Sequence, residues 1–501
     1  MAAPMEDNLF VFTDSDMSES DFSDGDEFEG FRQEDLGSVA EMLGPVKDTI
    51  ELYTDDSHDN NLVCDQEVNW TLRDEHPANI PFDSHTGLTQ KDDLLNEEEV
   101  EPIDFFNLLF DQSMWETMAK ETNKYADMKS TSMDATMRKP FSRLNSWKPV
   151  TPDELKIFLA LCIATGLVVK ADIDKYWSSN EVMLTPFFGK LMSRDRFLAI
   201  LSNFHLNDNS KEKLCGEVGF DPLHKVRPFV SMCRRNFVDT YDPSQDLSFD
   251  EATCPFKGRI KYKVYNPQKP NKFGLKLYQV CESSTGYCVG FDVYTGSERG
   301  PDYCEDYADC IDLVTGYEST TTRTVIGLLA YCGLLYKGHH VYMDNYYSSP
   351  ELYDLLFYMD TYACGTVRTI REEMPKAFGK NRTKLRAGTG MFRRRDHLLA
   401  IKFHDKRDIH MLTTIHNADC YVYDKKDKDG NYIVKPICIH DYVKKMGGVD
   451  LSDQLLQYYS VLRKTVKWWR KLFFHLLNLL ICNSYILHKK YASKKLSQHD
   501  P

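Results

Sequence analysis

The hydrophobic pattern of the chain changes from helical to alternating at about Leu247, and this change constrains the fold more than any other feature. Upstream, helical patterns begin near Asp104, and a later helix opens where Thr151 can cap it and Pro152 suits its first turn. Downstream, the expected order is strand 247–250, strand 275–282, strand 287–294, helix 322–335, strand 340–344, a helix from Ser349, and strand 362–367. The pattern predicts an α/β domain preceded by a mainly α unit.

Two further regions follow this α/β pattern. Residues 372–434 are rich in Lys, Arg, Asp and Gly and contain short β runs at 398–403 and 410–415, which predicts an insertion. Apolar helical sequence resumes after Gly448 and continues to about Tyr491.

Charge is distributed unevenly along the chain. The net charge is -15, but residues 1–60 alone hold 18 Asp and Glu against Arg32 and Lys47, and the rest holds 59 Lys and Arg against 58 Asp and Glu. Residues 1 to about 95 also lack a sustained apolar period, so we expect a disordered acidic N-terminus. From Gln454 onward, nine Lys and Arg accompany only Asp500, so this segment can neutralise phosphates.

No feature of the sequence predicts secretion or a membrane span. The apolar run 472–481 is far shorter than the roughly 20 residues that cross a bilayer. The first residues are acidic, unlike the basic start of a signal peptide. The 14 cysteines include no C-x-x-C pair, so we expect mostly reduced core residues of a cytosolic or nuclear protein.

Three aspartates occupy positions from which their carboxylates could come together in the folded chain. Asp250 and Asp344 each end an expected strand, and Asp450 stands at the start of the next long helix. Converging carboxylates suit Mg²⁺, and a pair of such ions can activate a water or a 3′-hydroxyl in phosphoryl transfer. Asp is also an ordinary turn residue at strand ends, so spacing alone leaves both interpretations open.

Sequence blocks around these aspartates resemble a known family. The blocks are 249–252 (FDEA) with 255–259 (PFKGR), 342–347 (YMDNYY), and 446–450 (MGGVD) with 453–454 (DQ). Their order and spacing resemble the three signature blocks of piggyBac transposases. Residues 364–368 (CGTVR), 463–465 (RKT) and 467–468 (KW) also resemble family sequence, and the resemblance covers roughly residues 100 to 490.

The resemblance implies an α/β fold with a ribonuclease-H-like catalytic domain, a β-rich insertion and a mainly α dimerisation and DNA-binding domain. The implied units are a disordered acidic tail (1–95), the helical domain's first part (96–245), the catalytic domain's first part (246–371), the insertion (372–434), the catalytic domain's last part (435–457) and the helical domain's second part (458–495).

The resemblance also implies a catalytic site. Asp250, Asp344 and Asp450 would be catalytic and would bind Mg²⁺ or Mn²⁺. Asp453, one helical turn beyond Asp450, is a possible fourth metal ligand, although an acid there would equally serve as a favourable charge at a helix N-terminus.

Basic residues near the first and third aspartates are candidate DNA contacts. They are Lys257, Arg259, Arg463, Lys464, Lys467 and Lys471, with Trp468 placed near the DNA end in similar transposases. Lys and Arg can hold phosphates while an aromatic ring stacks on an unpaired base. The alternative is a solvated basic face beside a core Trp. The implied partners are double-stranded DNA, transposon ends and a second copy in a homodimer, in the nucleus.

Two functions remain open from the sequence. One is a cut-and-paste transposase that cleaves and transfers DNA strands, with the TTAA-type target that the family implies. The other is a domesticated transposase-derived nuclear DNA-binding protein with little or no catalytic activity. Similar transposases usually end in a cysteine-rich module that reads the transposon end, whereas the last sixty residues here contain only Cys482. We therefore do not expect end recognition by such a module.

Overall fold

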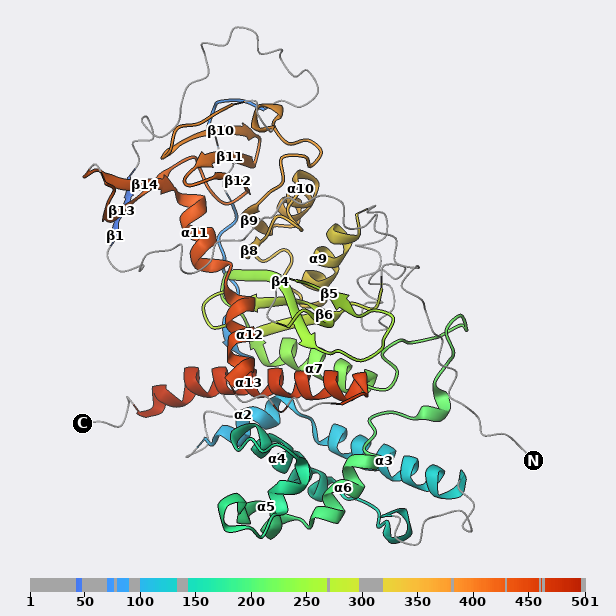
Figure 1. Cartoon of the computed structure of the whole chain (residues 1–501). Coiled ribbons are helices and arrows are strands. Elements are labelled where there is room, and N and C mark those ends of the chain that lie inside the picture. The colour runs from blue at the N-terminus through green and yellow to red at the C-terminus, as the bar shows by residue number, and fades with distance from the viewer. Residues whose placement is uncertain are drawn as a thin grey trace. The chain divides into compact units, whose positions relative to one another are not determined.

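The computed structural model describes residues 42–46, 70–75, 79–89, 100–132, 143–267, 271–296, 319–379, 383–428, 430–458, 461 and 465–496. Among these residues, nine strands form one mixed sheet (Figure 1). The strand order is β10 (Thr389–Arg395), β11 (Leu398–His404), β12 (Asp408–Thr413), β9 (Tyr362–Thr366), β8 (His340–Met343), β4 (Asp246–Pro255), β6 (Phe273–Glu282) and β5 (Val264–Tyr265), with β7 (Cys288–Val293) also paired to β6.

The centre of the sheet is parallel. β4 pairs with β8, and β8 pairs with β9, in parallel register. The connection from β8 to β9 runs through α10 (Pro350–Tyr358), as parallel neighbours require a crossover. α10 begins as expected, because the Ser349 hydroxyl accepts a hydrogen bond from the Leu352 N–H at 3.2 Å.

Other local expectations are also confirmed. β6 and β7 form the predicted hairpin, and Gly286 in its turn has a φ of 75°. The expected helix 322–335 is α9 (Thr320–Tyr331), which ends earlier because Gly333 takes a φ of 61° and closes the last turn. β4 is longer than the predicted strand and continues past Asp250 to Pro255.

The expected insertion is partly a continuation of the main sheet. β12 pairs antiparallel with β9, and β11 and β10 follow it outward. This pairing satisfies the backbone groups along the side of β9 that faces away from β8. Among the strands of the insertion that the structure describes, β13 (Cys420–Lys426) and β14 (Tyr432–Pro436) pair with each other and lie outside this sheet.

Helices precede and follow the sheet. Those before it are α2 (Pro102–Leu109), α3 (Gln112–Ser132), α4 (Pro152–Leu167), α5 (Pro186–Leu191), α6 (Arg194–Asn203) and α7 (Arg227–Thr240), with short 3₁₀ turns η4 (Arg143–Ser146), η5 (Ile173–Trp177), η6 (Glu181–Met183) and η7 (Asn209–Lys211). Those after it are α11 (Ile437–Lys445), α12 (Gly448–Tyr458) and α13 (Trp468–Leu496), and the short turn η10 (Lys376–Phe378) lies between β9 and β10. The predicted cap of α4 is present, because Thr151 accepts from the Glu154 N–H at 3.2 Å.

α13 packs against both the sheet and the helices that precede it in the chain. It contacts α2, α7 and β4, and Figure 1 shows it running between the sheet and the helices α2 to α6. One apolar stripe of α13 is fully buried, since Leu472, Leu476 and Leu479 are all 0% exposed. This burial makes α13 part of one continuous core with the sheet and the first helices.

Residues 70–89, which we call the strap, depart from the expected disorder where they are described. Thr71 forms a backbone bridge with Arg394 of β10, and Asp74 pairs with the Arg394 guanidinium at 2.6 Å. Further on, the Ile80 N–H donates to the Tyr362 hydroxyl at 2.7 Å. β2 (Gly87–Leu88) then pairs with β3 (Tyr241–Asp242). These polar contacts and the burial of Leu88 order a segment whose composition predicts disorder; residues 1–41 and 47–69 lie outside the described residues, as do 90–99.

Among the described residues, no helix combines the length and the hydropathy that crossing a bilayer needs.

Candidate catalytic site and nucleic-acid interface

The register of β4 and β8 brings two of the predicted aspartates together. Phe249 pairs with Met343 in parallel register, and Asp250 and Asp344 are the next residues of the two chains. Neighbouring strands lie about 4.8 Å apart, so the two residues occupy adjacent positions at the same end of the paired segment. A pair of carboxylates separated by 94 residues in sequence thus shares one place in the fold.

Asp344 lies in a tight turn just beyond β8. Its carboxylate accepts the Tyr346 N–H at 2.9 Å, and its backbone carbonyl accepts the Ser348 hydroxyl at 2.9 Å. Burial raises the pKa of Asp344 to about 6, the nearby Glu251 carboxylate adds to this rise, and the backbone N–H groups of Tyr346 and Tyr347 oppose it. A cation at this position would relieve the cost of keeping Asp344 ionised.

The third aspartate stands at the start of α12. The Val449 N–H donates to the Ser248 hydroxyl at 3.0 Å, and Ser248 shares a face of β4 with Asp250. Gly448 allows this close approach, because a Cβ there would lie 2.5 Å from the Ser248 hydroxyl oxygen. Asp450 is exposed in the first turn of α12, and Asp453 is half-buried one turn later. Within the described ranges, no group of three or more His, Cys, Asp or Glu side chains lies close enough to hold a metal ion.

Glu251 is a carboxylate near this site to which the sequence interpretation assigned no role. It accepts a hydrogen bond from the Tyr347 hydroxyl at 2.9 Å and forms an ion pair with Lys276 at 2.5 Å. The sequence signal was its position next to Asp250 in the first block. Its partners could not be foreseen, because the sheet register and the turn after β8 place them.

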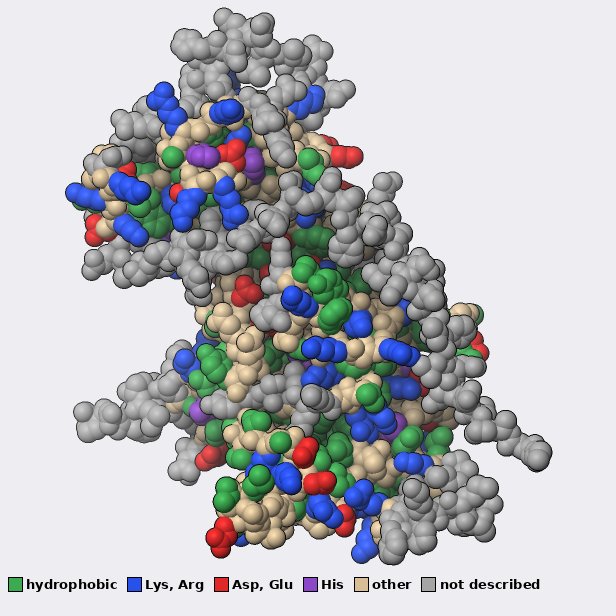
Figure 2. Space-filling model, in the orientation of Figure 1, with side chains coloured by type: hydrophobic (Ala, Val, Ile, Leu, Met, Phe, Trp, Pro, Cys, Tyr) green, Lys and Arg blue, Asp and Glu red, His purple; other side chains and the backbone are tan. Residues whose placement is uncertain are grey.

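The two groups of predicted basic residues come together around the end of β4. Lys257 and Arg259 are exposed just after that strand. Trp468 packs edge-on against Tyr262 of the same loop, with ring centroids 6.0 Å apart. The Cys254 thiol of β4 lies 3.7 Å from the carbonyl oxygen of Lys471. Figure 2 shows Lys and Arg side chains around the right-hand end of α13, where the helix begins.

The expectation that helical sequence runs from after Gly448 to about Tyr491 is wrong just before Trp468. Residues 465–467 are not helical, and α13 begins only at Trp468. Arg463 and Lys464 lie outside the described residues. The Thr465 hydroxyl accepts the Lys467 N–H at 3.2 Å, which holds this segment in a turn before the helix.

The first turn of α13 is anchored on α6. Trp469 is buried against Phe204, and the Arg470 guanidinium donates to the Ser202 and Phe204 carbonyls at 3.3 Å each. These carbonyls end α6, where a cation is favourable. Of the Trp pair, Trp469 is therefore a core residue, and Arg470 serves the fold.

Lys467 and Lys471 are half-buried cations. Burial and then the neighbouring cations Arg470, Lys129 and Lys225 lower the pKa of Lys467 to about 8. Burial also lowers the pKa of Lys471. Crowded cations with lowered pKa values gain free energy when an anion such as a phosphate approaches.

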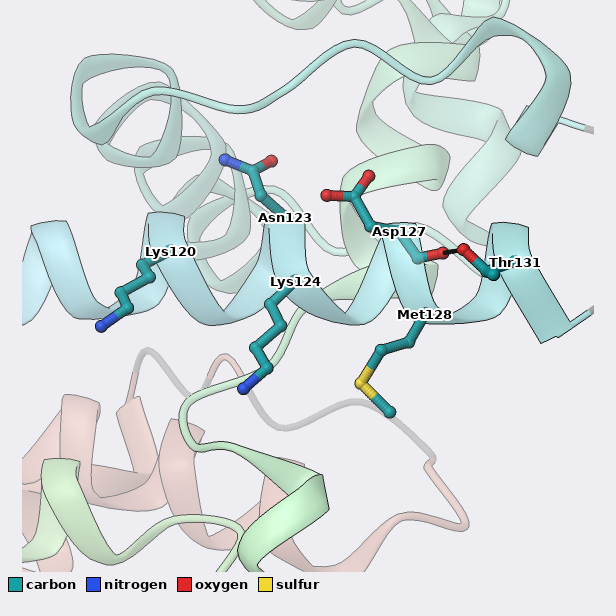
Figure 3. Close-up of a pocket in the computed structure, with 6 residues that line it drawn as sticks. All are labelled: Lys120, Asn123, Lys124, Asp127, Met128 and Thr131. Carbon is teal, nitrogen blue, oxygen red and sulfur yellow. Dashed lines mark hydrogen bonds between the residues drawn. The ribbon is translucent and has the colours of Figure 1, made fainter.

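A groove of about 810 Å³ along α3 is a separate feature (Figure 3). Its lining residues are Lys120, Asn123, Lys124, Asp127, Met128 and Thr131. Lys124 is already paired with Asp208 at 2.5 Å, which raises the pKa of Lys124 and lowers that of Asp208. Since an acid already pairs with one of its two lysines, we assign this groove no part in phosphate binding.

Comparison with known proteins identifies the family. A family model described as "Transposase IS4" matches residues 101–485, which is most of the chain. "PiggyBac transposable element-derived protein 2" of Homo sapiens is 24% identical over 509 residues, covering 97% of this chain and 78% of that protein. The chain belongs to the piggyBac transposase family. The resemblance drawn from the aspartate blocks is thereby confirmed.

Two further comparisons agree with this family assignment. "PiggyBac transposable element-derived protein 3" of Homo sapiens is 25% identical over 401 residues, covering 78% of this chain and 62% of that protein. Among solved structures, a cryo-EM structure of the piggyBac transposase synaptic complex with hairpin DNA matches with a TM-score of 0.65 and 22% identity, over 82% of this chain and 79% of that one. The mixed α/β fold of the chain is thus similar to that of piggyBac transposase.

Proposed function

We propose that this member of the piggyBac family is a transposase that cleaves and transfers DNA strands with the help of divalent metal ions, in a catalytic domain of the ribonuclease-H type. Asp250, Asp344 and Asp450 are the proposed catalytic residues, and Asp453 is a possible additional metal ligand. The observation that carries the proposal is the parallel register of β4 and β8, which makes Asp250 and Asp344 neighbours. The proposed target is of the TTAA type and the proposed compartment is the nucleus.

The residues present fit a hard divalent cation such as Mg²⁺ or Mn²⁺. Every proposed ligand is a carboxylate, and the Asp344 carboxylate is half-buried near that of Glu251. Such ions, when bound, activate an attacking water or 3′-hydroxyl and stabilise the leaving oxygen. The chain's own contribution is to hold Asp250 on a strand, Asp344 in a hydrogen-bonded turn and Asp450 on a helix anchored to Ser248.

DNA is the proposed partner, as duplex and as transposon ends. Lys257, Arg259, Lys467 and Lys471 are the proposed phosphate contacts, with Trp468 beside them, and Arg463 and Lys464 complete the set outside the described residues. The exposure of Lys257 and Arg259 and the packing of Trp468 on Tyr262 support a continuous basic surface near the end of β4. We propose that the protein acts as a homodimer.

The test is cleavage and joining of a hairpin-forming piggyBac-type element end flanked by TTAA, with Mg²⁺ or Mn²⁺. Asp250→Asn, Asp344→Asn and Asp450→Asn should each reduce cleavage to background while DNA binding in EDTA stays unchanged. Asp424→Asn, at an exposed carboxylate of β13, is the matched control and should cleave like the parent. Cleavage that survives any of the three variants would remove that aspartate from the site.

A second function is a DNA-binding protein that keeps the fold without cleaving. The names of two human relatives, which describe transposable element-derived proteins, favour it. DNA binding by the parent chain without cleavage, under any of the metal conditions above, would establish this second function in place of the first.

A further inference from the structure

The turn that carries Asp344 is held in place by side chains from two other strands. Inside the turn, Asp344 is fixed by the Tyr346 N–H and by Ser348. Three residues after Asp344, the buried Tyr347 donates its hydroxyl to Glu251 of β4 at 2.9 Å. Tyr347 also packs edge-on against Phe249, with ring centroids 5.0 Å apart. The position of the turn therefore depends on the hydrogen bond that Glu251 accepts from the Tyr347 hydroxyl.

Lys276 of β6 completes this arrangement. Its ammonium group forms an ion pair with Glu251 at 2.5 Å and is only 17% exposed. It also lies 4.7 Å from the ring centroid of Tyr278 and 4.9 Å from that of Tyr346, the residue whose N–H holds the Asp344 carboxylate. Lys276 thus contacts the turn directly and through Glu251.

The geometry separates Glu251 from a metal-binding role. Consecutive residues of a strand point to opposite faces, so Glu251 and Asp250 leave β4 in different directions. At least one Glu251 oxygen is already engaged by a hydroxyl and an ammonium group. Glu251 is therefore suited to hold the neighbouring turn.

We propose that Glu251, Tyr347 and Lys276 are positioning residues that fix the Asp344 carboxylate for metal binding, an inference that rests on the proposed function. They act through the turn 344–348 and touch neither the metal nor the DNA. Residues that orient a ligand in this way typically alter metal affinity by roughly 10- to 100-fold when they are replaced.

The chain contains a matched control for this unit. At the end of β6, the Tyr241 hydroxyl donates to Glu282 at 2.9 Å and accepts from Lys490. Tyr241 is 1% exposed, as is Tyr347. Tyr347→Phe and Tyr241→Phe therefore remove the same group from the same kind of environment, but only the first lies beside Asp344.

The experiment measures Mn²⁺ affinity of the full chain directly, by titration, and DNA nicking against Mn²⁺ concentration. Tyr347→Phe should weaken Mn²⁺ binding by roughly 10- to 100-fold. Glu251→Gln, which keeps an acceptor for the Tyr347 hydroxyl, should weaken it less than Glu251→Ala. Tyr241→Phe should lose a similar amount of stability and leave Mn²⁺ affinity at the parent value.

The results of this experiment distinguish a failure of this inference from a failure of the proposed function on which it rests. Parental Mn²⁺ affinity in a folded Tyr347→Phe protein, or equal losses in Tyr347→Phe and Tyr241→Phe, would overturn the positioning role and leave the proposed function standing. A parent chain that binds Mn²⁺ no better than Asp344→Asn would overturn the proposed function, and this inference with it.

Discussion

At the residue scale, the oxygens of Asp344 accept hydrogen bonds, but its carboxylate lies where a negative charge is unfavourable. The turn supplies hydrogen bonds to its oxygens, yet burial and the neighbouring Glu251 carboxylate both oppose ionisation. Ionised Asp344 lowers the stability of the metal-free protein, whereas a bound cation would compensate its negative charge and remove this cost. This balance couples the stability of the protein to pH and to metal binding.

Asp344→Asn should stabilise the metal-free protein at alkaline pH. The folded-state pKa of about 6 exceeds the ordinary 3.8, so the stability contributed by Asp344 is fully present below about pH 4 and is lost as pH rises through 6. The rise of the pKa from its ordinary value to about 6 corresponds to about 3 kcal/mol, which is the upper limit of the gain at pH 8. Urea unfolding in EDTA at pH 5 and pH 8 measures the free energy of unfolding. A variant no more stable than the parent at pH 8 would contradict this account of Asp344.

At the scale of elements, α13 is attached to the sheet by the Asn483 side chain, which pairs with the backbone of β7 in the way that a neighbouring strand would. The Asn483 amide donates to the Cys288 carbonyl and accepts from the Cys288 N–H, both at 2.9 Å. These are the two bonds that a neighbouring strand would make to β7. Asn483 is 0% exposed, so water cannot replace either bond.

Asn483→Ala should therefore cost roughly 2–6 kcal/mol of unfolding free energy, because two buried backbone groups lose their partners at about 1–3 kcal/mol each. Asn123 makes the same pair of bonds to Val150, at 2.9 and 2.7 Å, but is only half-buried. Asn123→Ala is the comparison and should cost about 1 kcal/mol, since water can enter. Equal losses in the two variants, measured by urea unfolding, would show that burial of Asn483 adds nothing.

The start of α13 should determine the salt dependence of DNA binding. If Lys467 and Lys471 each meet a phosphate, replacing both with Ala should lower the slope of log affinity against log salt by about 2, at roughly 0.9 per contact. Lys489→Ala, at the exposed far end of the same helix, should leave the slope near the parent value. The measurement is duplex affinity between low and physiological salt, and an unchanged slope in the double variant would refute the phosphate contacts.

Sequence patterns predicted those parts of the elements that depend on neighbours in the chain. The Ser349 cap, the β6–β7 hairpin and the strand end before Asp344 all follow from local chemistry, whereas β4 does not end at Asp250 as expected but continues to Pro255. Features set by distant partners were missed, such as β12 pairing with β9, because strand edges do not specify their neighbours by periodicity. The late start of α13 was missed for the same reason: the anchors of its first turn lie in α6.

At the scale of the whole molecule, the strap connects regions that are far apart in sequence. It contacts β10 through Thr71 and Asp74, β9 through Ile80 and α13 through Leu88. Disorder was expected because residues 1 to about 95, taken together, are rich in acidic residues and have no sustained apolar period. The contacts that order the strap lie in partners more than 150 residues away, which no local pattern reveals.

Deleting residues 1–89 should destabilise the protein much more than deleting residues 1–69. The longer deletion removes the buried Leu88 and the Asp74 partner of Arg394, a guanidinium that is only 2% exposed. Removing one partner of such a pair alone costs about 3–5 kcal/mol. Asp74→Asn in the full chain tests that contribution separately. Thermal unfolding of the three proteins is the measurement, and similar melting temperatures for the two deletions would show that the strap contributes little.

The contacts of the strap also limit the order in which parts of the newly synthesised chain can fold. Thr71 must wait for Arg394, which is synthesised 323 residues later, and the Leu88 N–H must wait for the Tyr491 hydroxyl, 403 residues later. Chains leave the ribosome at about 5–20 residues per second, so the N-terminal segment stays without its partners for tens of seconds. Such distant contacts close slowly because the loop entropy is lost before they form. The nascent chain therefore cannot complete its fold domain by domain, because the strap has to wait for the last helix before it can make all of its contacts.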